Sequence, residues 1–142
     1  MAQPYFEDVT PGTELPPLVK RPTNVSVFLY GVALWTAHRI HYDADHARSE
    51  GYPNVLVTGG IMGAYLVQML VSWAGLPTSL RKLSLSYRAL AHPGDTLTAR
   101  GIVRRTYRED GLNLAYCDVF VENQEGARPV VGSAVVSLPS RP

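Results

Sequence analysis

The stretch GGIMGAYLVQMLVSWAG, residues 59–75, decides the fold of this chain. It contains no charged side chain, and only a tyrosine, a glutamine and a serine interrupt its apolar residues. Gly75 and Pro77 favour the end of a helix that runs from about Gly60 to Trp73. A helix that is apolar on nearly every side must be enclosed by protein. We therefore predict a central, buried helix.

The sequence after the central helix changes to a period of two, which is typical of half-buried strands. Leu83 and Leu85, for example, alternate with Lys82 and Ser84. The turn sequences HPGD, REDG and NQEG separate the successive strands. We expect a four-strand antiparallel meander over residues 82–89, 97–104, 112–122 and 130–138.

The first half of the chain is predicted to be mainly helical. Its proline-rich start indicates an extended segment with an edge strand around Leu15 to Lys20. Capping residues predict a helix from Asn24 to about Thr36, and Asp43 is expected to cap a short helix that ends near Ser49.

One apolar helix and one antiparallel sheet must each bury an apolar face, so we expect the sheet to wrap around the helix. The fold class is then α+β, with a single domain over residues 1–142. The side of the helix that the sheet leaves open needs another cover. The helix that begins at Asn24, a second subunit, or both could provide it.

Composition excludes several classes of function. The chain has 142 residues, of which 46% are hydrophobic and 18% charged, with a net charge of +1. This balance argues against a nucleic-acid partner, which requires an excess of clustered basic residues. The single cysteine, Cys117, cannot form an internal disulfide, and the start of the chain lacks a basic and apolar leader. The uncharged runs are interrupted before they could span a membrane, so we expect a cytoplasmic protein.

The stretch HRIHYDADHARSEGYPNVLVTGG, residues 38–60, contains three of the four histidines and leads into the central helix. These histidines lack the spacing of a familiar zinc site, and we expect no metal and no other cofactor. A histidine can transfer protons near neutral pH, and a helix N-terminus offers free amides to a developing negative charge. This combination suits reactions that form enolate character on a thioester. We expect the fourth histidine, His92, to be an exposed turn residue.

The sequence IHYDADHARSEGYPNVLVTGG, residues 40–60, resembles the hydratase motif of the MaoC-like enoyl-CoA hydratases and dehydratases, a hotdog-fold family. The variant HRIHYD followed by EGYP is similar to type 2 hydroxyacyl-thioester dehydratases and mesaconyl-CoA hydratases. LVQMLVSWAG, residues 66–75, is similar to small hydratase subunits of actinobacterial steroid side-chain degradation. The opening FEDVTPGTELPPL matches the family as well, so the resemblance extends over most of the chain.

The resemblance implies a role for individual residues. His41 falls on the catalytic histidine of the family, and Gly59 corresponds to its oxyanion-hole glycine. Thr36 stands where the common motif has a catalytic aspartate, and its hydroxyl can orient water but cannot act as an acid or base near pH 7. Matching positions that we expect to bind substrate are His38, Arg39, Thr58 and Gly60.

The leading hypothesis is a hydro-lyase that interconverts a 2-enoyl and an (R)-3-hydroxyacyl thioester of coenzyme A or acyl carrier protein. An alternative is a degenerate hotdog subunit that binds acyl-CoA and supports a catalytic partner. A hotdog thioesterase is disfavoured because no acid lies between Glu50 and Asp95. We expect a homodimer, or a heterodimer with another hotdog subunit.

Basic residues spread over the predicted strands have two interpretations. They could form a solvated sheet face, or two or three of them could contact the phosphates of coenzyme A. The sequence does not indicate which of these residues would contact a phosphate. They are Arg81, Lys82, Arg88, Arg100, Arg104, Arg105 and Arg108.

Overall fold

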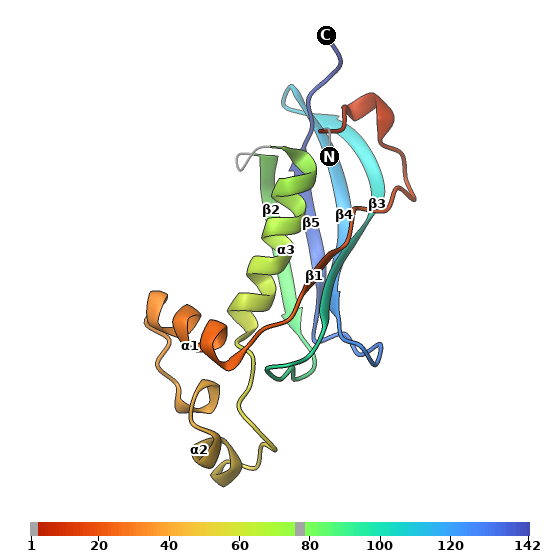
Figure 1. Cartoon of the computed structure of the whole chain (residues 1–142). Coiled ribbons are helices and arrows are strands. Elements are labelled where there is room, and N and C mark those ends of the chain that lie inside the picture. Colours follow the sequence, from red (N-terminus) through yellow and green to blue (C-terminus); the bar gives the residue numbers. More distant parts are fainter. Residues whose placement is uncertain (1–2, 76–78) are drawn as a thin grey trace.

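The computed structural model describes residues 3–75 and 79–142, and its largest element is a five-stranded antiparallel sheet. The strand order is β1-β3-β4-β5-β2. Figure 1 shows the sheet curving around one long helix, α3, which lies against its concave face. This is the α+β hotdog architecture predicted from the sequence. The strands are β1 (Leu18–Lys20), β2 (Leu80–Tyr87), β3 (Leu97–Glu109), β4 (Leu112–Glu122) and β5 (Val130–Ser137).

The central helix α3 spans Gly59–Ala74, which confirms its prediction. Gly75 ends it in the left-handed conformation, with φ at 87°, where a side chain would be strained. Pro77, also expected at this end, lies outside the described residues. The buried side of α3, including Leu66 and Leu70, packs on apolar side chains of the strands. The sequence of α3 thus supplies the centre of the core.

The meander prediction is wrong for β2. This strand pairs with β5 at the far edge of the sheet, whereas β3, β4 and β5 pair in sequence order. Residues 88–96 connect β2 to β3 and can extend over about 30 Å, while three strand spacings need only about 14 Å. The connection is therefore long enough to pass two strands. Pairing also stops at Tyr87, before Ala89, and β3 continues beyond Arg104 to Glu109.

The helices α1 (Asn24–Ala33) and α2 (Ala44–Ser49) lie beyond one end of α3 (Figure 1). Thr23 caps α1, but the helix ends before the expected Thr36. The reason is a reversal of the chain, in which Trp35 takes a φ of 55° and the Thr36 amide donates to the Gly31 carbonyl at 2.9 Å.

The open side of α3 is only partly covered. The Tyr30 side chain of α1 reaches the first turn of α3, beside Gly60, but α1 does not extend along the helix. Small or polar residues on the open side are exposed, namely Gly60, Ala64, Gln68 and Ser72. Among the described residues, no helix combines the length and the apolar character that crossing a membrane requires.

Candidate active site

The histidine-rich loop is fixed by its own polar side chains. His38 begins a short 3-10 helix, η2 (Arg39–His41), where its Nδ1 accepts from the Ile40 amide at 3.4 Å. Arg39 donates to Oδ2 of Asp43 at 2.6 Å, and the other carboxylate oxygen accepts from the His46 amide at 3.0 Å. The His46 amide first, and then Arg39, lower the pKa of Asp43. Asp43 therefore caps α2, as predicted, and Arg39 is engaged with it.

His41 has a defined tautomer. Its Nδ1 lies 2.9 Å from the backbone oxygen of Leu56, which can only accept a hydrogen bond. In this bond Nδ1 must carry the proton, so Nε2 of the neutral ring keeps its lone pair. The Leu56 amide in turn donates to the Ile40 oxygen at 2.9 Å. The imidazole is thus oriented as a proton acceptor by the main chain alone.

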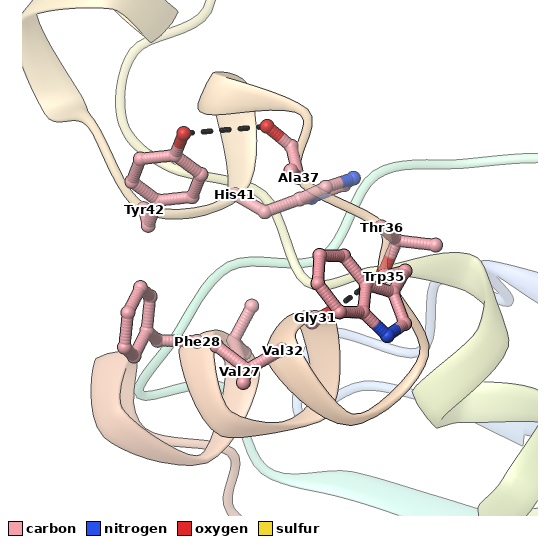
Figure 2. Close-up of a pocket in the computed structure, with 9 residues that line it drawn as sticks. All are labelled: Val27, Phe28, Gly31, Val32, Trp35, Thr36, Ala37, His41 and Tyr42. Atoms are coloured by element: carbon pink, nitrogen blue, oxygen red, sulfur yellow. Dashed lines mark hydrogen bonds between the residues drawn. The ribbon is translucent and has the colours of Figure 1, made fainter.

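His41 and Thr36 line the same pocket, which has a volume of about 300 Å³ and lies between α1 and the loop that follows it. Figure 2 shows the His41 ring directed from the loop toward the segment that carries Thr36. Apart from these two side chains, the Tyr42 hydroxyl and the Trp35 indole N–H, the lining side chains are apolar, and none of them is a carboxylate, Lys or Arg. The other lining residues are Val27, Phe28, Gly31, Val32, Trp35, Ala37 and Tyr42.

Gly31 allows the chain to reverse at this pocket. A Cβ atom at position 31 would lie 3.1 Å from the Thr36 backbone oxygen, closer than most real contacts. The Thr36 hydroxyl makes only a long hydrogen bond, 3.5 Å, to the Gly31 oxygen. The Tyr42 hydroxyl donates to the Ala37 oxygen at 3.3 Å (Figure 2). Thr36 therefore keeps a hydroxyl that can turn toward water.

The start of α3 is capped by Thr58, which is 5% exposed and whose hydroxyl accepts from the Ile61 amide at 3.4 Å. Within the described part of the chain, the amides of Gly59 and Gly60 make no hydrogen bond. A helix start with free amides carries partial positive charge. Gly59 and Gly60 therefore retain the donors that an oxyanion would need.

Two tyrosines that the sequence analysis did not single out pack on this helix start. A Cβ at Gly59 would lie 2.8 Å from Cε1 of Tyr87, and a Cβ at Gly60 would lie 2.8 Å from the Tyr30 hydroxyl oxygen. Burial, and then the neighbouring Tyr87, raise the pKa of Tyr30. The glycine pair leaves room for these rings, whether or not a substrate approaches. Tyr30 and Tyr87 lie 57 positions apart in sequence, so no local pattern pairs them.

The expected site residues are only partly gathered in one place. The pocket lining includes His41 and Thr36, but not the helix-start residues or the predicted substrate-binding pair His38 and Arg39. The His38 ring centroid lies 6.2 Å from that of His41, so His38 is a neighbour of His41 but does not line the pocket. Trp35, 92% exposed, is a pocket residue that the sequence analysis missed. The signal in the sequence is the uncharged, largely apolar run of residues 24–37, which has more apolar residues than one buried helix face requires.

His92 is not the exposed turn residue that we expected. It is half-buried, and its Nδ1 lies 2.9 Å from the Val55 backbone oxygen. It therefore supports the segment that also orients His41. His46 pairs with Glu50 at 2.8 Å. Across residues 3–75 and 79–142, no group of three or more His, Cys, Asp or Glu side chains could hold a metal ion.

Comparisons with known proteins concern the family and the fold of the chain. A family model described as hydroxyacyl-thioester dehydratase type 2 matches residues 13–94. An (R)-hydratase from A. caviae involved in PHA biosynthesis is 25% identical, with a TM-score of 0.84 over 94% of this chain and 99% of its own. No curated protein matches the chain.

Two further solved structures show the same fold. A MaoC-like dehydratase from Rhodospirillum rubrum is 19% identical, with a TM-score of 0.83 over 97% of this chain and 98% of its own. A chain of the ChsH1-ChsH2 complex from Mycobacterium tuberculosis is 22% identical, with a TM-score of 0.79 over 92% of this chain and 98% of its own.

Proposed function

The chain belongs to the hydroxyacyl-thioester dehydratase type 2 family, and from this premise we propose that it hydrates a 2-enoyl thioester reversibly to the (R)-3-hydroxyacyl thioester. The acyl group is carried by coenzyme A or acyl carrier protein. The observation that carries the proposal is the hydrogen bond from Nδ1 of His41 to Leu56, which leaves Nε2 as a base beside an apolar pocket.

In the proposed reaction, His41 takes a proton from water as the water oxygen bonds to C3 of the enoyl group. The double-bond electrons move toward the thioester oxygen, and the imidazolium then returns its proton to C2. Thr36 helps to orient the water through its hydroxyl. The free amides of Gly59 and Gly60 stabilise the charge that develops on the thioester oxygen. Dehydration follows the same path in reverse.

The side chains that line the pocket also indicate what kind of acyl group it could accept. Its lining holds no Arg or Lys, so a free carboxylate on the acyl group would lose its hydration without gaining a cationic partner. An apolar acyl group instead gains from contact with Phe28, Val32 and Trp35. We therefore propose an uncharged, apolar 2-enoyl group.

A degenerate subunit that supports a catalytic partner is the second candidate. The observation that favours it is Thr36, because the pocket lining then holds no carboxylate that could act together with His41. The exposed residues on the open side of α3 and the apolar surface of α1 support assembly into a homodimer or a heterodimer. The ChsH1-ChsH2 complex is one structural neighbour that consists of two kinds of chain. In either case we propose a cytoplasmic location.

The test is hydration of crotonyl-CoA, and of an enoyl-CoA with a longer acyl chain, followed by the loss of enoyl-thioester absorbance. His41→Gln removes the imidazole base and keeps a polar side chain of similar length, so kcat should fall by about 10²- to 10⁴-fold. His46→Gln is the matched control, because His46 lies nearby in helix α2 and outside the pocket, and its kcat should change little. Full activity of His41→Gln would overturn the assignment. Inactivity of the unaltered oligomer, relieved by a partner subunit, would favour the second candidate.

A further inference from the structure

The face of the sheet that is turned away from α3 carries a hollow of about 550 Å³. Leu83 and Leu85 of β2 pack toward the core, so the alternating Lys82 and Ser84 face outward. Residues from β2, β5, β4 and β3 line this outer-face hollow. They include Arg81, Lys82, Arg105, Tyr107, Glu109 and Tyr116.

One row of paired residues crosses the hollow. Lys82 is opposite Val135, Val135 is opposite Tyr116, and Tyr116 is opposite Arg105. The row therefore has a cation at each end and an aromatic ring between them. The two cationic residues are three strand spacings apart, about 14 Å at the backbone. Long side chains can fold inward from both ends toward one ligand.

Two irregularities in strand pairing lie at the cations of the hollow. In β2 the register shifts between Leu80 and Lys82, and in β3 it shifts between Val103 and Arg105. A bulge redirects the side chains on either side of it. The first shift leaves Arg81 and Lys82 side by side in the lining, and the second directs Arg105 into it.

The cations of the hollow differ from most arginines of this chain in having no acidic partner. Among the described residues, Arg81, Lys82 and Arg105 form no ion pair, although Arg81 donates to the Ser137 hydroxyl at 3.1 Å. Glu109 is the only acid in the lining. Six other arginines are ion-paired, namely Arg39, Arg48, Arg100, Arg104, Arg128 and Arg141. Three unpaired cations against one acid favour an anionic ligand.

Aromatic rings add a second preference. The guanidinium carbon of Arg105 lies 4.9 Å from the ring centroid of Tyr107 and 5.3 Å from that of Tyr116. These contacts hold the guanidinium in place, which reduces the entropy lost when it binds an anion. Tyrosine rings also provide flat surfaces on which another ring can stack.

We propose that the outer-face hollow binds a ligand that combines an aromatic ring with phosphate groups, as the adenosine end of coenzyme A does. The identification with coenzyme A rests on the proposed function, whereas the binding of a ring-bearing phosphate does not.

The test is calorimetric titration of the purified protein with 3′-phosphoadenosine 5′-phosphate, ADP and pyrophosphate. Arg105→Ala should weaken binding of the bisphosphate by about tenfold or more, the loss of one charge-assisted hydrogen bond. Arg104→Ala is the matched control, since Arg104 is adjacent but pairs with Asp118, and its Kd should stay within about twofold. Lys82→Ala should also weaken binding, and thermal unfolding verifies that each variant is folded.

The possible results distinguish three claims: that the hollow is a binding site, that its ligand is coenzyme A, and that the protein is a hydratase. Equal affinity of the Arg105→Ala and Arg104→Ala proteins would overturn the proposal, and so would pyrophosphate that binds as tightly as the bisphosphate. ADP that binds more tightly than the bisphosphate would support the hollow but overturn coenzyme A as its ligand. An inactive protein that still binds the bisphosphate through Arg105 would contradict the proposed function alone. In an active protein, Arg105→Ala should raise KM for crotonyl-CoA but not for crotonyl-pantetheine, which lacks the nucleotide.

Discussion

Replacing Gly59 by alanine tests whether the glycine at the start of α3 makes room for the Tyr87 ring or for a substrate. The new Cβ would lie 2.8 and 2.9 Å from two ring carbons of Tyr87, whereas carbon atoms in contact are normally about 3.5–4.0 Å apart. The ring must therefore retreat by nearly 1 Å. Such overpacking costs about 1–3 kcal/mol, and the better helix propensity of alanine returns up to about 1 kcal/mol.

The expected free energies form a double-mutant cycle. Gly59→Ala should destabilise the parent protein by about 0–2 kcal/mol but stabilise a Tyr87→Ala protein by up to about 1 kcal/mol. Tyr87 is 54% exposed, so its ring can relax and the coupling should lie toward the lower end, about 1 kcal/mol. Urea unfolding of the four proteins measures these values.

The reasoning is refuted if Gly59→Ala has the same effect on stability, within about 0.5 kcal/mol, with and without Tyr87. Hydration rates of the same proteins test the other role of the glycine. If the thioester must approach position 59 closely, the double variant stays inactive even though its stability recovers. If the double variant regains the activity of Tyr87→Ala, the glycine serves only the tyrosine.

Three further predictions concern stability and reactivity. Gly132→Ala should cost about 3 kcal/mol or more in urea unfolding, because its Cβ would lie 2.0 Å from a backbone oxygen of β2, which cannot move aside alone. The His46 amide and Arg39 lower the pKa of Asp43, so its contribution to stability should be complete above about pH 5 and disappear as the pH falls through that lowered value. Asp43→Asn should flatten this part of the pH profile of urea unfolding. Burial raises the pKa of the Cys117 thiol to about 12, so iodoacetamide should not modify it at pH 8 until urea unfolds the protein, and modification of the folded protein would contradict this.

The sequence predicted the elements of this fold better than their pairing. The apolar composition of residues 59–75 and the alternation after residue 80 are local properties, and both elements formed where expected. The partner of β2 is not a local property. Strands that follow each other in sequence form a hairpin most readily when the connection is short. The nine residues from 88 to 96 are long enough for β2 to pair either with β3 or with β5. Helix α1 ended early because the chain reverses at Trp35, which has a positive φ. A tryptophan does not predict this conformation, so nothing in the sequence signals the reversal.

The candidate site was predictable to the extent that it lies within one segment. Thr36 and His41 are five positions apart, and the structure brings them into one pocket. Tyr30 and Tyr87 meet the helix start from different elements, so only the fold brings them there. His92 was misjudged for the same reason, since its acceptor, the Val55 oxygen, is 37 positions away.

The main-chain partner of His41 has a consequence for how this site can change. In many sites a second side chain orients the catalytic histidine, and a single substitution can remove it. Here the acceptor is the Leu56 carbonyl, which every amino acid provides. Position 56 can therefore vary in its side chain without releasing the imidazole, provided that the chain keeps its path. The orientation of this imidazole is set by the backbone, so a comparison of side chains alone would not reveal it.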